Sequence, residues 1–252
     1  GHGALDAANT GEHYNVAIGT NALGTETSGA IGCVAIGYQA LYVQNRAASA
    51  NTAIGYLALQ NLGNGTTYSG KRNVALGWGA GGSGVFGGGS DGHADDNTLV
   101  GYSAGYAITT GYDNVIVGSD AGDAVTTGYS NVLLGKSAGS AMIANNRNVA
   151  IGYNAMANAD GSENYNVAIG YNAFATETSN ATYNVAVGYQ ALFLANGGGK
   201  NTAIGGIAGA ELGNGTGNTL IGYNAGNQLD ANEGYNTFVG HDAGSNADGA
   251  ES

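Results

Sequence analysis

Two neighbouring glycine-rich stretches, residues 60–72 and 81–96, hold or adjoin several side chains that are suited to contacting a ligand. They bring aromatic and basic groups together, and the only tryptophan lies between them. Loops on a rigid scaffold often carry recognition residues, although loop insertions also cost little stability. We therefore expect a ligand-binding region here, with a neutral insertion as the alternative. The candidate ligand contacts are Tyr68, Lys71, Arg72, Trp78, Phe86 and His93.

Four aspartates in the same part of the chain are candidates for a cation site. Asp96 and Asp113 occupy equivalent places one repeat apart, and Asp91 and Asp95 lie close to Asp96 in the sequence. Two carboxylates at such close range repel each other unless a cation or water separates them, and Ca²⁺ prefers oxygen ligands. The Gly-Gly-x-Gly-x-Asp pattern of calcium-binding rolls is not repeated here. A Ca²⁺ site is one interpretation, and solvated aspartates on an acidic surface are the other.

Residues for catalysis are not grouped along the chain. The four histidines, His2, His13, His93 and His241, are far apart, and the glutamates are scattered. Neither a His-Glu-x-x-His zinc pattern nor a phosphate-binding loop occurs. The sequence therefore predicts no enzyme and no cofactor other than the calcium ion considered above.

A repeat sets the elements that must position these residues. The unit Asn-Val-Ala-Ile-Gly-Tyr-Asn-Ala recurs thirteen times with variations, mostly in steps of 17 or 18 residues, and the two long steps of 22 and 24 residues contain the glycine-rich stretches. A fixed period along a whole chain indicates a solenoid. We expect an all-β chain, a parallel β-solenoid of about 13 coils of 17–18 residues, as one repeat domain over residues 1–252 of a longer chain. The copies begin at Asn15, Cys33, Asn51, Asn73, Asn97, Asn114, Asn131, Asn148, Asn166, Asn184, Asn201, Asn218 and Asn236.

The composition limits the class of partner. The chain has 48 Gly, no Pro, only 10% charged residues and a net charge of −12. An acidic chain is poorly suited to nucleic acid or to anionic membrane surfaces. No apolar run approaches the roughly 18 residues of a membrane span, so we expect no membrane insertion in this segment. The single Cys33 excludes a disulfide framework within the chain.

The first four positions of each repeat predict a short strand, with the asparagine numbered as position 1. Positions 2 and 4 are always β-branched or aliphatic, and alternation along a strand places them on one face, which we expect to be inside the coil. Position 3 is usually Ala but is larger in five copies, and apolar side chains there predict a second buried seam, against another subunit. The residues of this oligomer seam are Leu99, Ile116, Leu133, Leu220 and Phe238.

Two further positions predict ladders along the stack. Strands in neighbouring coils lie about 4.8 Å apart, so each asparagine at position 1 is expected above the one before, with its amide hydrogen-bonded along the stack. Tyrosine is frequent at position 6 and should form an outer stripe. This stripe has two interpretations. Its rings stack and stiffen the structure, or they form a strip that binds carbohydrate or another surface.

The recurring Asn-[Val/Thr]-Ala-Ile-Gly-x-x-Ala pattern, over residues 15–252, resembles the head repeats of trimeric autotransporter adhesins and the related repeats of bacteriophage tail fibres. The resemblance implies a left-handed β-roll with three chains side by side as a homotrimer. These repeats are longer than the usual autotransporter unit, which favours the fibre-type relatives.

We therefore expect an extracellular, cell-surface or virion fibre segment, which attaches to a host or cell-surface glycan or protein through loops presented several times on one assembly. One alternative is a subunit of a self-assembling extracellular filament with no specific receptor. A less favoured alternative is a polysaccharide-degrading tailspike.

Overall fold

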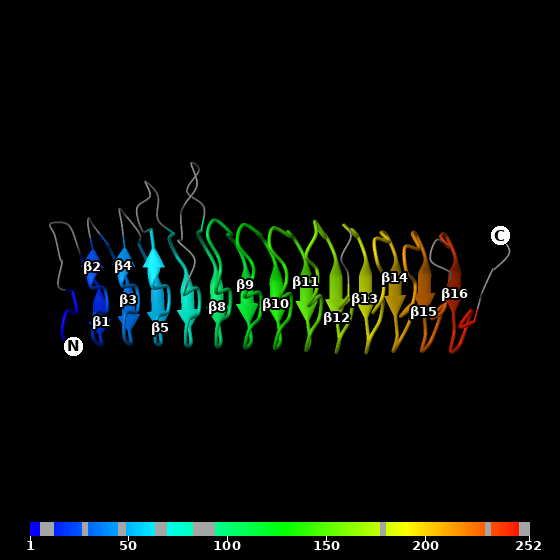
Figure 1. Ribbon diagram of the computed structural model, residues 1–252, viewed down its shortest axis with the longest axis horizontal. Coiled ribbons are helices and arrows are strands. Elements are labelled where there is room, and N and C mark those ends of the chain that lie inside the picture. Colours follow the sequence, from blue (N-terminus) through cyan, green and yellow to red (C-terminus); the bar gives the residue numbers. More distant parts are fainter. Residues whose placement is uncertain are drawn as a thin grey trace. The chain divides into compact units, whose positions relative to one another are not determined.

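The computed structural model describes residues 1–5, 13–26, 30–44, 49–63, 70–82, 94–176, 180–229 and 233–246. These residues contain strands, turns and bends but no helix, and therefore no helix that is long and apolar enough to cross a membrane. The chain forms two compact units, Gly1–Ser130 and Asn131–Ser252. Each unit is built from parallel strands that follow one another in chain order, as expected for a parallel β-solenoid (Figure 1).

In the first unit, each repeat contributes one three-residue strand to a parallel sheet. A second, smaller parallel sheet, which the sequence did not predict, follows the first three of these strands. The main strands are β1 (Val16–Ile18), β3 (Val34–Ile36), β5 (Thr52–Ile54), β7 (Val74–Leu76), β8 (Thr98–Val100) and β9 (Val115–Val117), and the smaller sheet holds β2 (Thr25–Glu26), β4 (Val43–Gln44) and β6 (Asn61–Leu62).

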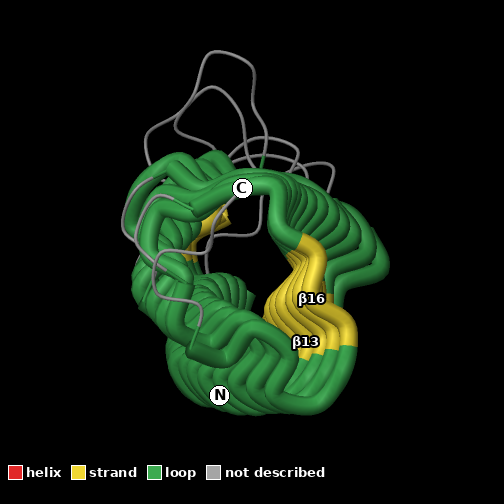
Figure 2. Tube along the Cα trace, turned by 90° about the vertical axis from the view of Figure 1, so that its right-hand side faces the viewer, coloured by secondary structure: helices red, strands yellow, loops and turns green. Residues whose placement is uncertain are grey.

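In the second unit, seven strands stack in the same way, and Figure 2 shows β13 to β16 lying one behind another on the same side of the coil. Pairing joins equal repeat positions, for example Val149 with Val167 and Ala150 with Ala168. Within the two units, eleven such pairings connect successive main strands. The strands are β10 (Val132–Leu134), β11 (Val149–Ile151), β12 (Val167–Ile169), β13 (Val185–Val187), β14 (Thr202–Ile204), β15 (Thr219–Ile221) and β16 (Thr237–Val239).

The glycine at position 5 turns the chain at the end of each strand. Its φ lies between +129° and +143° in all thirteen copies, a region that side chains rarely adopt. A Cβ at Gly188 would also overlap with the carbonyl of Gly205 one coil further on, and the same overlap is repeated along both units. This corner therefore excludes a side chain on two independent grounds.

The predicted orientation of the strands is wrong. Position 3 points into the coil, whereas positions 2 and 4 are half-buried or exposed on its outer face. The residues assigned to an oligomer seam consequently belong to the core of their own chain. Leu99, Ile116, Leu133 and Leu220 are completely buried, and Phe238 in the last described coil is half-buried.

The reason for the larger side chains at position 3 is a size match with position 9, which also points inward. Where position 3 is Ala, position 9 is usually large, as in the pairs Ala17 with Leu23 and Ala168 with Phe174. Where position 3 is large, position 9 is Gly, and a Cβ at Gly226 would come within 2.6 Å of a methyl group of Leu220. In eleven of the thirteen copies, one large side chain from these two positions fills the coil.

Candidate functional site

A ladder of aromatic rings runs along the outside of the first unit. Tyr38, Tyr56, Trp78 and Tyr102 occupy position 6, directly after the glycine corner, in four consecutive coils. Successive ring centroids lie 5.2, 5.7 and 4.9 Å apart with interplanar angles of 11–13°. All four side chains are exposed at their outer edges. The predicted outer stripe is confirmed, and Trp78 is one of its inner rungs.

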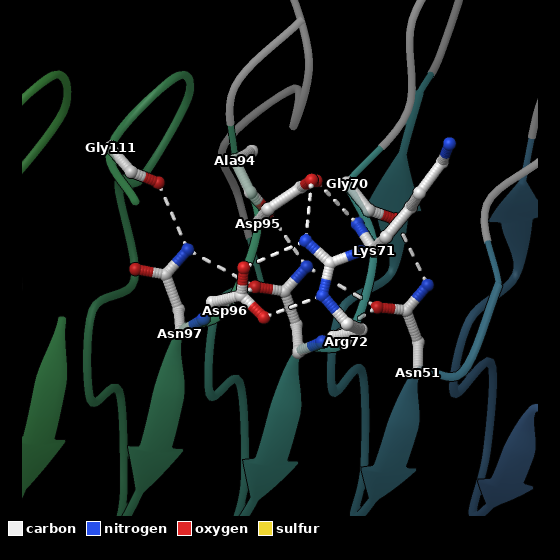
Figure 3. Close-up of polar contacts among 10 residues, drawn as sticks. Asn51, Gly70, Lys71, Arg72, Ala94, Asp95, Asp96, Asn97 and Gly111 are labelled. Carbon is white, nitrogen blue, oxygen red and sulfur yellow. Dashed lines mark hydrogen bonds and ion pairs between the residues drawn. The ribbon is translucent and has the colours of Figure 1, made fainter. Parts of the chain in front are cut away.

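Arg72 occupies the position before Asn73 and lies against two carboxylates of the next coil, as Figure 3 shows. Its Nε and Nη2 donate to the two oxygens of Asp96, at 2.7 Å each, and Nη2 also lies 3.1 Å from Asp95 Oδ2. The guanidinium holds the pKa of the Asp96 carboxyl below its usual range, chiefly through the hydrogen bond. In turn, hydrogen bonding and the charge of Asp96 raise the pKa of Arg72.

Asp95 also fixes the backbone of the preceding coil. Its Oδ1 accepts a hydrogen bond of 2.8 Å from the amide of Lys71, and the Lys71 amine points away from the carboxylates (Figure 3). Asp95 and Asp96 therefore have cationic and backbone donors on nearly all of their oxygens. The structure thus joins Lys71 and Arg72, predicted as ligand contacts, to two of the predicted metal ligands.

The Ca²⁺ interpretation finds no support among the described residues, which contain no group of three His, Cys, Asp or Glu side chains that can hold a metal ion. The guanidinium of Arg72 supplies a positive charge to the carboxylates of Asp95 and Asp96, two of the four predicted cation ligands. Asp113 is exposed on the following coil. Asp91 lies outside the described residues, as do Tyr68, Phe86 and His93.

The asparagines at position 1 form the predicted ladder, and this ladder anchors the returning ends of both enlarged loops. Asn51 Oδ1 accepts hydrogen bonds from the amide and side chain of Asn73, at 2.9 and 3.2 Å. The Nδ2 groups of Asn51 and Asn73 donate to the carbonyls of Gly70 and Ala94, at 3.0 and 2.7 Å (Figure 3). Because these asparagines are buried and fully paired, they hold Gly70 and Ala94, where the two loops return to the coil, in fixed positions.

Cys33 replaces asparagine in this ladder and remains a buried thiol. Its amide donates to Asn15 Oδ1 at 2.9 Å, as an asparagine amide does elsewhere, and Gln44 Nε2 lies 3.4 Å from its sulfur. Burial and this backbone contact give Cys33 the place of a small residue in the stack.

The second unit carries two outer ladders of its own. At position 6, Tyr153, Tyr171 and Tyr189 stack at 5.2 and 5.5 Å. At the position before the asparagine, which we call position 0, Tyr165 and Tyr183 stack at 5.0 Å. The ladder at position 0 was not predicted, although tyrosine at this position recurs in the sequence.

Two further features were missed. Glu163 is completely buried, and its carboxylate accepts hydrogen bonds from Asn145 Nδ2 and the Asn180 amide, at 2.5 and 3.0 Å. In addition, residues 101–105 and 135–139 match the Gly-x-Ser-x-Gly pattern of serine hydrolases. Ser103 and Ser137 lie on turns with φ of +52° and +55° rather than on a strand-to-helix turn. The described histidines, His2, His13 and His241, lie several coils away in the sequence, so no serine–histidine pair forms among the described residues.

Comparison of the chain with protein-family models, with curated proteins and with solved structures gave no match.

Proposed function

We propose that this chain is a segment of an extracellular or virion-surface fibre, that several copies associate side by side, and that its role is attachment rather than catalysis. One observation carries the proposal. Each strand turns its valine, threonine, isoleucine or leucine side chains at positions 2 and 4 outward, and Ile204 and Ile221 expose 40% and 37% of their surface. A row of outward apolar side chains of this kind indicates a contact site, because covering apolar surface gains roughly 25 cal/mol per Å².

The partner that fits this face best is another copy of the same chain. The outward side chains recur once per coil, at the strand spacing of about 4.8 Å. A second copy aligned in parallel presents apolar side chains with the same period, so contacts repeat from coil to coil within each unit. The resemblance to trimeric fibre repeats implies three copies, and the chain then contributes identical surfaces three times.

Attachment is assigned to the outer surface of the first unit. The ladder from Tyr38 to Tyr102 lies on the coils that carry the enlarged loops, and the asparagine ladder holds the loop ends in place. A cell-surface glycan or protein is the proposed ligand. Several copies of one modest site give strong binding through avidity, so a deep pocket is not required.

The association is tested by sedimentation equilibrium of the full chain, whose single-chain mass is 24.8 kDa. We expect three chains in the wild-type particle and a shift to single chains when Ile204→Asp is combined with Ile221→Asp. The matched control, Asn214→Asp with Gln228→Asp, adds the same charge at exposed positions outside the strands and should keep the wild-type mass. A wild-type chain that sediments as a monomer, or a double strand variant that keeps its mass, contradicts the proposal.

Attachment is tested on an immobilised panel of bacterial capsular polysaccharides and lipopolysaccharides. On the neutral polysaccharides of this panel, Trp78→Ala is expected to abolish the binding that the wild-type protein shows. Tyr171→Ala removes an equivalent inner rung from the ladder of the second unit and should leave that binding intact. Equal losses in the two variants indicate that stacking only stabilises the coils, and release of reducing sugars from the panel argues against a non-enzymatic role.

A further inference from the structure

A cation-capped aromatic ladder crosses the second unit at position 0. Arg147, Tyr165, Tyr183 and Lys200 each precede the asparagine in four consecutive coils, with φ between +57° and +61°. The backbone amide of each rung after Arg147 donates to the carbonyl of the residue that precedes the rung one coil earlier. Lys200 N, for example, donates to Thr182 O at 2.9 Å, and Thr182 directly precedes Tyr183. These bonds keep the four residues in register. The side chains of all four are exposed, Tyr165 by 43% and Tyr183 by 56%.

The first three rungs of this ladder, Arg147, Tyr165 and Tyr183, contact one another through their faces. The Arg147 guanidinium lies 5.4 Å from the centre of the Tyr165 ring, and the Tyr165 and Tyr183 rings are 5.0 Å apart with an interplanar angle of 5°. Both faces of the Tyr165 ring are therefore covered, and its edge is the part that meets the solvent. Arg147 Nη1 also donates to the Tyr165 hydroxyl oxygen at 2.9 Å, which leaves the hydroxyl hydrogen to donate outward.

Hydrogen-bond donors consequently dominate this part of the surface. Lys200 forms no ion pair with any described carboxylate, and Gly197, Gly198 and Gly199 before it have no side chains to cover it. The buried acid of this unit, Glu163, accepts hydrogen bonds from Asn145 and the Asn180 amide. At physiological ionic strength, charges beyond about 8 Å are largely screened, so the net charge of −12 acts only weakly here.

We propose that Arg147, Tyr165, Tyr183 and Lys200 form a binding site for an acidic polysaccharide, with a carboxylated sugar chain lying along the ladder. The cations are three coil steps, or about 14 Å, apart, which suits a short oligosaccharide bearing more than one carboxylate. Its carboxylates pair with Lys200 and Arg147, and its hydroxyls accept from the tyrosine hydroxyls between them. The amide of Asn164 adjoins Tyr165 and adds a neutral polar group beside the ladder.

The same geometry argues against a single-stranded nucleic acid as the ligand. Such ligands bind by stacking bases on open aromatic faces. Here Arg147 covers one face of Tyr165, and Tyr183 covers the other. A glycan needs only the edges and hydroxyls, which are accessible.

The experiment measures binding of the intact protein to polygalacturonate by affinity electrophoresis, with dextran as the neutral polysaccharide and poly(dT) as the anionic non-glycan. We expect retardation by polygalacturonate alone, with an affinity that falls as salt is added. Lys200→Gln and Arg147→Gln should each weaken binding by about tenfold, since each removes a charge-assisted hydrogen bond. Lys200→Arg should restore most of the affinity, and Tyr183→Phe should lower it while keeping the stack.

Lys136→Gln is the matched control, because Lys136 is an exposed cation of the same unit at position 6 rather than position 0. It should leave the affinity unchanged. The proposal is overturned if Lys136→Gln weakens binding as much as Lys200→Gln, if dextran binds equally well, if poly(dT) binds more tightly, or if polygalacturonate does not bind. The glycan as ligand class rests on the proposed attachment function, but the readout is independent of Trp78, so a failure here leaves attachment through the first unit testable.

Discussion

The inner and outer faces of the strands differ in what fills them. Inside, eleven of the thirteen coils take one large side chain from either position 3 or position 9, and the other of these two positions is small. Outside, positions 2 and 4 carry a medium-sized Val, Ile, Leu or Thr in every coil without any such exchange. A compensating pair is the mark of a closed volume, whereas uniform side chains are what a repeating contact surface requires.

The strongest test of this difference is Leu133→Asp. Leu133 is completely buried, so the variant places an unpaired carboxylate in the core and should unfold the chain, at a cost of several kcal/mol. Thermal unfolding followed by circular dichroism measures the effect, and Leu133→Met, which conserves volume, serves as the control. A Leu133→Asp chain that melts normally and only loses mass would restore the seam that the sequence suggested.

Moving the large side chain of one coil from position 3 to position 9 tests whether the two positions share one volume. Leu220→Ala alone should cost about 2–5 kcal/mol by leaving a cavity, and Gly226→Leu alone about 1–3 kcal/mol by overpacking. The double variant recreates the arrangement of Ala17 with Leu23 and should be more stable than the sum of the single effects predicts. Denaturant unfolding gives the coupling free energy, and additive single effects would show that the two positions do not share a volume.

Asn201→Ala tests the inward-facing ladder. Asn201 Oδ1 accepts from the amide and side chain of Asn218, at 2.9 and 3.1 Å, and its Nδ2 donates to Gly215 O at 2.8 Å. Leaving these buried groups unpaired should cost about 1–3 kcal/mol. Denaturant unfolding measures the loss, with exposed Asn214→Ala as the control that should stay close to the wild-type stability.

Of these variants, Arg72→Gln should change the free energy of unfolding least, because Arg72 lies on the outer surface. The Arg72 hydrogen bond lowers the pKa of Asp96, so the pair stabilises the fold above the ordinary aspartate pKa, and this contribution disappears as pH falls through the pKa of Asp96 in the folded state. Without Arg72, that pKa should rise toward the usual value. Carboxyl NMR titration of Asp96 measures the shift, and Lys136→Gln, which is remote in the sequence, should not change it.

The sequence was sufficient to predict the repeat, the parallel strands, the glycine corner and the asparagine and tyrosine ladders, because each depends on residues that recur at fixed spacing. It did not settle which strand face is inside. A three-residue strand alternates in the same way for either orientation, and β-branched residues suit both. The size match between positions 3 and 9 indicates which face is inside, and it is visible in the sequence. Examples are Leu220 with Gly226 and Ala168 with Phe174.

The candidate site was predicted less completely, for two physical reasons. The contact of Arg72 with Asp95 and Asp96 follows from coil register. Arg72 and Asp96 both occupy position 0, in consecutive coils, and Asp95 directly precedes Asp96. The sequence prediction treated the aspartates as a set of like charges and did not pair them with Arg72 in the preceding coil. In contrast, the buried carboxylate of Glu163 depends on how two long returning segments meet, and repeat spacing alone does not determine that.

The in-register pairing of equal positions has a genetic consequence. Each coil is closed by hydrogen bonds to its immediate neighbours, so a coil removed or duplicated as a whole leaves the remaining coils with the same kind of partner. Recombination between the similar repeats changes the length of the gene in such whole units. A lineage can therefore lengthen or shorten this protein in steps of 17 or 18 codons while every surviving surface keeps its chemistry.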